Sequence, residues 1–221
     1  MTNESLFILP IHPMKTVSRK EQERQFQKNL IIQAAAQIFS EKGFEKTTLD
    51  EIAEKSEFSK GSLYNFFKNK EDLFLSTLEI GVNKLIKQMR LVESIHTSTE
   101  KQTKAILKVM VDYFHTHDSF NKHRAFFQMM VNEKRVIACQ ASDHFISRMH
   151  NMHKNMTRFF ASIFQNGIDS GELKQGDAQF YSEVFLGIIH HHIFMVNMNL
   201  TQFDQAKADQ IFDAFFNGIG A

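Results

Sequence analysis

The sequence contains few of the residues that cross-link a fold or break a helix. Its 221 residues include one cysteine and two prolines, and tryptophan is absent. The single Cys139 excludes an intramolecular disulfide, which fits a reducing compartment such as the cytosol. Both prolines, Pro10 and Pro13, lie near the N-terminus. Since proline breaks helix interiors, the remaining chain is suited to an all-helical body.

Long apolar runs and a strong net charge are also missing. No apolar run approaches the ~20 residues needed to cross a bilayer. The short apolar run near the N-terminus has no basic leader before it, which makes it a poor signal peptide. The net charge is +1, although residues 15–70 carry a mild excess of Lys and Arg, which permits an anionic partner. We therefore expect a cytoplasmic protein with no membrane partner.

Apolar residues recur at helical spacing from residue 18 onward, and no strand alternation or internal repeat is visible. Gly43 supplies a helix stop. Helix caps are expected at Ser18, Thr48, Ser59, Asn69 and Asp177. The helix opened by Asn69 should reach about residue 94. Further helices are expected at about 100–117, 120–137, 141–169, 178–199 and 204–218. The sequence thus predicts an all-α fold of about nine helices.

Two helical patterns too short to be stable alone follow one another in "TTLDEIAEKSEFSKGSLYNFF", residues 47–67. A turn of about three residues, "SEF", joins them as in a helix-turn-helix. Both must pack on the helix before them. In the second, the side facing that helix consists of Leu63, Phe66 and Phe67. The opposite, outward face consists of Lys60, Gly61, Tyr64, Asn65 and Lys68.

The outward residues have the chemistry of a DNA-reading helix. Asn65 can form paired hydrogen bonds with an adenine edge, and Gly61 permits close approach of a phosphate. The hydroxyls of Tyr64 and Thr48 can bind phosphates, which positions a helix without reading sequence. The alternative is a helical hairpin with a solvated polar face, and the spacing alone does not decide between them.

Residues 31–74, "IIQAAAQIFSEKGFEKTTLDEIAEKSEFSKGSLYNFFKNKEDLF", resemble the DNA-binding domain of the tetracycline-repressor (TetR) family. The resemblance implies a homodimeric transcriptional regulator, usually a repressor, that binds a double-stranded DNA operator. The DNA contacts that it implies are Thr47, Thr48, Ser59, Lys60, Gly61, Ser62, Tyr64, Asn65 and Lys68. One departure lies in the turn, where Glu57-Phe58 replaces the family's usual Gly-Val. If residue 57 needs a positive φ, Glu adds a small strain.

The resemblance also implies how the chain is divided. Residues 1–17 are expected to be an irregular arm, residues 18–70 the helix-turn-helix domain, and residues 71–221 the ligand-binding and dimerisation domain. "KTVSRK", residues 15–20, is either a basic arm that reaches a minor groove or a tail without contacts. The helix at 178–199 is apolar on more than one side, as expected of a helix that faces both core and partner, although a wholly intrachain core helix fits as well.

Methionine and phenylalanine at helical spacing could line an adaptable apolar cavity for an apolar or aromatic effector. The same stripe would also suit a plain core. The candidate pocket residues are Phe126, Met129, Met130, Met149, Met152, Met156, Phe159, His191 and Met195.

The sequence holds eleven histidines. His150 and His153 have a spacing that can chelate a metal, but solvated or core histidines explain them equally, and we assign no metal or cofactor. Consecutive helical residues point about 100° apart. The run "HHH" at 190–192 therefore sends its rings in different directions. No catalytic cluster is visible, which argues against an enzyme; a small-molecule carrier with an incidental helix-turn-helix stays an alternative.

Overall fold

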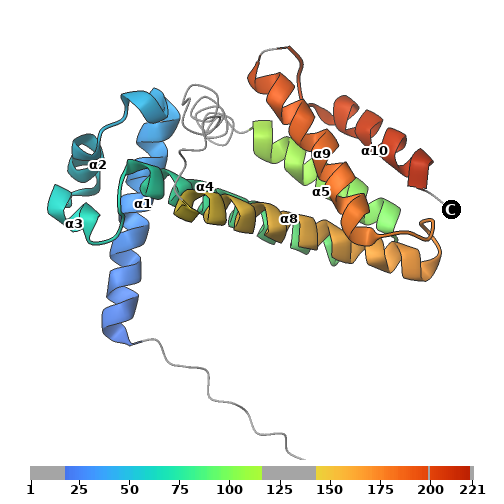
Figure 1. Cartoon of the computed structure of the whole chain (residues 1–221), viewed down its shortest axis with the longest axis horizontal. Helices are drawn as coiled ribbons and strands as arrows, with labels where there is room; N and C mark the ends of the chain where they lie inside the picture. The colour runs from blue at the N-terminus through green and yellow to red at the C-terminus, as the bar shows by residue number, and fades with distance from the viewer. Residues whose placement is uncertain (1–17, 116–142, 199, 220–221) are drawn as a thin grey trace, which may run out of the picture.

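The computed structural model describes residues 18–115, 143–198 and 200–219, which form eight helices without a β-strand (Figure 1). The all-α prediction is confirmed. The helix expected at about 120–137 lies outside the described residues, as do the arm at residues 1–17 and Cys139. The helices are α1 Arg19–Lys46, α2 Leu49–Ser56, α3 Lys60–Tyr64, α4 Lys70–Glu93, α5 Thr99–His115, α8 Asp143–Ser170, α9 Ala178–Asn197 and α10 Gln205–Ile219.

Local sequence signals explain where these helices begin and end. All five expected caps are confirmed, each with a side-chain oxygen that accepts a backbone N–H of the first turn; they are Ser18, Thr48, Ser59, Asn69 and Asp177. The stop predicted at Gly43 is confirmed as a non-helical residue with φ 78° near the end of α1. The short segment after it turns the chain toward α2.

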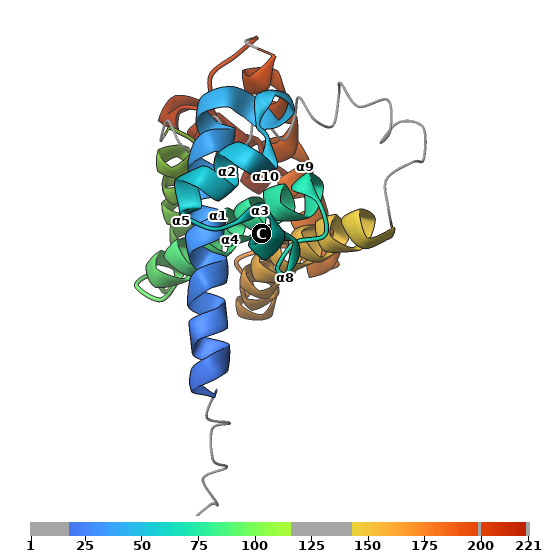
Figure 2. The same cartoon turned by 90° about the vertical axis from the view of Figure 1, so that its left-hand side faces the viewer.

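The helices form two groups joined by a long pair. The helices α2 and α3 pack beside α1 at one end of the molecule (Figures 1 and 2). The helices α4 and α8 run together away from them, and α5, α9 and α10 complete the other end. No helix in the described part of the chain is long and apolar enough to cross a membrane.

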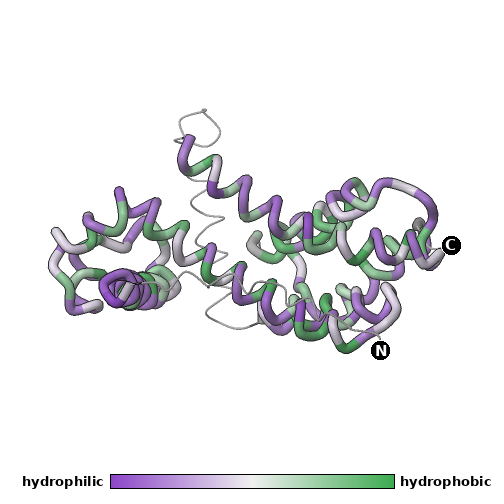
Figure 3. The backbone as a smooth tube through the Cα atoms, turned by 90° about the horizontal axis from the view of Figure 1, so that it is seen from below, coloured by the Kyte–Doolittle hydropathy of each residue, from purple (hydrophilic) through white to green (hydrophobic). Residues whose placement is uncertain are grey.

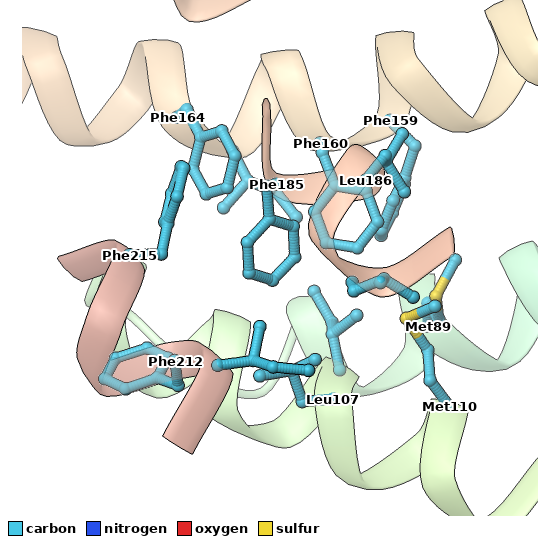
Figure 4. Close-up of a cluster of buried hydrophobic side chains, with 14 of the residues drawn as sticks. Met89, Leu107, Met110, Phe159, Phe160, Phe164, Phe185, Leu186, Phe212 and Phe215 are labelled. Carbon is cyan, nitrogen blue, oxygen red and sulfur yellow. The ribbon is translucent and has the colours of Figure 1, made fainter. Parts of the chain in front are cut away.

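Two buried apolar clusters correspond to the two ends. The N-terminal cluster joins α1, α2 and α3 to the start of α4, and the C-terminal cluster joins the rest of α4 to α5, α8, α9 and α10. Phe164, Phe185 and Phe215 meet with ring centroids 4.9–5.6 Å apart at the centre of the second (Figure 4). Each such side chain contributes roughly 1.5–3 kcal/mol by leaving water. The helix α4 therefore belongs to both cores.

The first three turns of α1 extend beyond the N-terminal cluster. Residues 18–30 are exposed apart from the half-buried Lys28. Figure 3 shows this helix end-on with hydrophilic residues around it. Its apolar stripe starts at Ile31, so the core holds only the second half of the helix.

Candidate DNA-binding surface and ligand cavity

The corner between α2 and α3 depends on both ends of α2, which begins at a capping residue and ends at a residue in the left-handed conformation. Thr48 and Glu51 form a reciprocal capping box at the start of α2. Glu57 ends the helix with φ 60° and ψ 28°, so the residue does take the positive φ for which glycine is usual. The Phe58 N–H then donates to the Ala53 carbonyl at 3.0 Å, which closes the turn.

The helix α3 is held by its buried side. Leu63 and Phe67 are almost fully buried in the N-terminal cluster. Ser59 caps the helix by accepting the Ser62 N–H at 3.1 Å. The opposite face is open, and 53% of Tyr64 is exposed. A five-residue helix is thus fixed in orientation by its neighbours, with a polar face turned outward.

Most of the predicted DNA contacts share this outward surface. Ser62 is half-buried, and seven others are exposed: Thr48, Ser59, Lys60, Gly61, Tyr64, Asn65 and Lys68. Ser62 and Asn65 also line a groove of about 420 Å³ between α3 and the projecting half of α1. Lys20, Arg24 and the acidic Glu23 of α1 line the same groove, so α1 adds a small net positive charge next to α3.

Thr47 differs from the other predicted contacts because only 1% of it is exposed. Its hydroxyl donates to the Gly43 carbonyl at 2.7 Å. The side chain therefore supports the corner between α1 and α2 and does not form part of the outward surface.

Lys70 secures the same corner, a role that the sequence indicates only through a basic residue that follows the cap at Asn69. Its amine donates to the carbonyls of Phe44 and Thr47 at 3.0 and 3.1 Å, where α1 ends. The amine also lies 4.3 Å from the centre of the Phe44 ring. A cation at a helix C-terminus is favourable because the carbonyl ends carry partial negative charge. Lys70 thus ties the start of α4 to α1.

The charges on the outward surface are partly paired. Lys60 donates to the Asp50 carboxylate at 2.9 Å, and this hydrogen bond raises the pKa of the lysine amine. Both side chains are largely exposed, so the pair is weak and a phosphate can replace the carboxylate. On the α1 side, the guanidinium of Arg24 lies 5.8 Å from the centre of the Phe66 ring.

A cavity of about 370 Å³ lies where the two clusters meet. Its wall comes from α4, α5, α8 and α9: Leu78, Val82, Leu85, Met110, Phe114, Met149, Met152, His153, Met156, Leu186, His190, Ile193 and Phe194. Leu78, Met149 and Met152 also pack in the N-terminal cluster. A molecule in this cavity would therefore touch side chains that belong to the core of the helix-turn-helix.

The predicted pocket residues divide into three groups. Met149, Met152 and Met156 line the cavity. Phe159 is buried in the C-terminal core instead, and neither His191 nor Met195 lies on the described wall of the cavity. The other predicted residues, Phe126, Met129 and Met130, lie outside the described residues.

Among the histidines of α9, the one on the cavity wall is His190 rather than the predicted His191, which is exposed. One residue along a helix changes direction by about 100°, so the choice depends on the helix's rotation, which the sequence leaves open. His190 remains open to solvent at the edge of the cavity. The surrounding protein and the nearby His153 nevertheless lower its pKa. In the described part of the chain, no three His, Cys, Asp or Glu side chains group as metal ligands would.

Arg148 connects α8 to the first three turns of α4, a link that the sequence did not reveal. Its guanidinium pairs with the carboxylates of Asp72 and Glu79 and donates to the Ser76 hydroxyl at 3.0 Å. Asp72 in turn accepts the backbone N–H of Lys68 at 2.9 Å. Met149 and Met152, within about one turn of Arg148 in α8, line the cavity. Hydrogen bonds thus run from a residue next to the cavity wall to the end of the helix-turn-helix.

An all-helical chain that presents a braced α2–α3 corner with an open polar face is a helix-turn-helix transcriptional regulator, and comparison with known proteins identifies its family. Residues 31–77 match the family model for "Bacterial regulatory proteins, tetR family". The chain belongs to the TetR family of transcriptional regulators, which are not enzymes.

Relatives from Bacillus subtilis match over most of the chain. The uncharacterised HTH-type transcriptional regulator YfiR is 25% identical over 187 residues, which cover 81% of this chain and 82% of that protein. The fatty acid metabolism regulator protein is 23% identical, covering 86% of this chain and 93% of the relative. The crystal structure of the regulator FadR in complex with stearoyl-CoA has a TM-score of 0.68 at 20% identity, covering 86% of this chain and 98% of that one. The last comparison shows that the fold is shared.

Proposed function

We propose that the chain is a ligand-responsive repressor that binds a near-palindromic operator as a homodimer and is released by an apolar effector. The proposal is supported by three residues, Leu78, Met149 and Met152, that line the cavity and also pack in the N-terminal cluster. The same cluster contains Leu63 of α3. A ligand that changes the packing of these side chains changes the support of the DNA-reading helix. In this proposal residues 18–70 bind DNA, and residues 71–221 dimerise and bind the effector, in the cytoplasm.

On the DNA side, we assign the outward residues two kinds of role. Asn65 reads a base edge in the major groove, where an amide can pair with adenine. Thr48, Ser59, Ser62 and Tyr64 bind phosphates through hydroxyls, while Lys60 and Lys68 do so through charge, which positions α3 without reading sequence. Thr47 supports the corner from inside, which agrees with its burial.

For the dimer, we propose the outer face of α9 as the contact. Phe180, Val184, Gly187, His191 and Met198 are separated by four, three, four and seven residues, and all five are exposed. That spacing puts them on one side of a helix. A second copy related by two-fold symmetry would cover this side and place two α3 helices on one operator. Half-sites one helical turn, roughly 34–36 Å, apart would match them.

For the effector, the apolar cavity favours an apolar or aromatic molecule. The methionines at 149, 152 and 156 suit a flexible ligand because unbranched thioethers repack easily. A B. subtilis relative is named for fatty acid metabolism, and FadR was crystallised with stearoyl-CoA. These names support an acyl chain as a first candidate.

Selection of bound sequences from random double-stranded DNA tests the DNA-binding part of the proposal. We expect enrichment of one near-palindrome, with an affinity that falls as salt rises because phosphates are neutralised. Lys68→Ala should weaken binding to every sequence, whereas Asn65→Ala should relax the preference at one position of each half-site. No enrichment together with no salt-sensitive binding would favour a small-molecule carrier instead.

Sedimentation analysis tests the dimer. Val184→Glu places a charge in the middle of the proposed contact and should yield monomers that lose operator affinity at least 10-fold. Lys154→Glu, on the exposed side of α8, is the matched control and should remain dimeric. A Val184→Glu variant that still sediments as a dimer would place the contact elsewhere.

A further inference from the structure

The described wall of the cavity is apolar except at one place. Eleven of its thirteen residues are Leu, Ile, Val, Met or Phe, and the other two are His153 of α8 and His190 of α9. Apolar burial is non-directional and gives little discrimination between ligands of similar size. Polar groups in such a pocket fix orientation and specificity, so these two histidines are where a ligand would be recognised.

The two rings face each other across the α8–α9 contact. Their centroids are 6.0 Å apart and their planes are inclined by 41°. Both side chains are accessible to solvent, so the pair lies where the cavity opens. The Thr157 hydroxyl lies 3.4 Å from His153 Nε2, a long contact, and no hydrogen bond to the His190 ring occurs among the described residues. The N–H groups of both rings are therefore available to a ligand.

The arrangement of the rings also suits an anion. The surrounding protein and the nearby His153 lower the pKa of His190, and an anion between the rings would offset this effect. An oxyanion placed between the rings would accept an N–H from each, and charge-assisted hydrogen bonds of this kind are roughly twice as strong as neutral ones. A metal ion fits less well because protein sites usually supply three or four ligands, and no third candidate ligand groups with the pair among the residues described.

We propose that His153 and His190 bind the anionic oxygen head group of an amphipathic ligand whose apolar chain fills the cavity. The inference rests on the proposed effector site and names the class of its ligand: a long-chain acid with a carboxylate or a phosphate head. The head lies at the open edge between α8 and α9, and the chain extends toward Leu78 and Val82 of α4.

A matched set of ligands tests the head group separately from the chain. Calorimetry on the full chain would compare alkyl carboxylic acids, alkyl phosphates and alkyl alcohols of 8, 12 and 16 carbons. We expect the preferred acid to bind at least 10-fold more tightly than the alcohol of equal length. Comparing the affinities of the carboxylic acids with those of the phosphates then identifies the preferred head group.

Two substitutions locate the preference on the histidines. In the His153→Gln and His190→Gln variants, the acid should bind no more than about threefold more tightly than the alcohol of equal length. The alcohol should keep its wild-type affinity, which would show that the cavity is intact. His150→Gln, at an exposed position of α8 away from the cavity wall, should retain the full preference.

The remaining outcomes separate the two proposals. Equal affinity of acid and alcohol for the wild-type chain overturns the role of the histidines but leaves an apolar effector site. Failure of every ligand to bind removes the apolar effector and this inference with it. Stoichiometric Zn²⁺ binding that requires both histidines, without any preference for acids, overturns the inference in favour of a metal site.

Discussion

Gly61 shows how a single residue can be important for a partner and not for the fold. A Cβ built at this position would meet only the Ser59 hydroxyl, at 3.8 Å, which is an ordinary contact. Its backbone does not need a positive φ either. Nothing within the described chain therefore requires glycine, and the space in front of α3 is available to a close phosphate or base.

We predict that Gly61→Ala keeps or raises the melting temperature but weakens operator binding at least 10-fold. Alanine favours a helix over glycine by up to about 1 kcal/mol, while its methyl group would hold the DNA away. Gly218→Ala in α10, another position with open space, should leave operator affinity unchanged. Thermal melts and fluorescence anisotropy measure the two effects; unchanged affinity in Gly61→Ala would contradict close approach at this residue.

Glu57 adopts a positive φ in the turn, a conformation that glutamate disfavours. Asparagine tolerates the left-handed conformation better than other non-glycine residues. We predict that Glu57→Asn stabilises the chain by about 0.5 kcal/mol, a rise in melting temperature of roughly 1–2 °C for a chain of this size. Glu54→Asn, at an exposed helical position of α2, should instead lower the melting temperature slightly because asparagine is the poorer helix former.

At the scale of elements, α4 and α8 form the connection between the two ends of the molecule. The side chains of Arg148 and Asp72 are mostly buried, and that of Glu79 is about one-third exposed. Removing the guanidinium leaves two neighbouring carboxylates that repel one another. The first turn of α4 also loses the group that orients Asp72 toward the Lys68 N–H.

We predict that Arg148→Met lowers the free energy of unfolding by about 2 kcal/mol, less than for a fully buried pair because Glu79 reaches water. Amide exchange at residues 68–73 should become at least fivefold faster than in the wild type. A uniform loss of stability would instead accelerate exchange throughout the chain. Lys154→Met, an exposed change on the same helix, is the control. Unaltered exchange at Lys68 would show that Arg148 does not position this turn.

At the scale of the whole molecule, two histidines make stability depend on pH. Surrounding protein lowers the pKa of both His190 and His192, and the charges of Lys207 and His191 add to the effect at His192. The buried Nδ1 of His192 has no hydrogen-bond partner among the described residues. The unfolded chain, with an ordinary pKa near 6.5, therefore binds more protons than the folded chain once the pH falls below that value.

We accordingly predict that the free energy of unfolding decreases as the pH falls below about 6.5 toward the lowered pKa values, and that it is insensitive to these groups above that range. His192→Gln should reduce the loss of melting temperature between pH 7.5 and pH 5.5. His150→Gln, at an exposed position of α8, serves as the comparison. A pH dependence identical in wild type and His192→Gln would contradict the assignment.

Much of the fold was predictable from short-range patterns. The caps at Thr48 and Asn69 and the stop at Gly43 depend on residues within one turn, so the sequence reveals them. The outward face of α3 follows in the same way, because Leu63 and Phe67 fix which side is buried. The burial of Thr47 could not be predicted in this way, because whether its side chain faces outward depends on the path of the chain after Gly43.

The sequence by itself determined the helices, the helix-turn-helix and the family, because these depend on local spacing and on one contiguous motif. Tertiary structure alone decided that Arg148 meets Asp72, that His190 rather than His191 faces the cavity, and that Leu78 packs in the N-terminal cluster and also lines the cavity. These facts depend on the rotation and crossing of helices that are far apart in the chain. Helical periodicity shows which residues share a face, but only packing shows what that face meets.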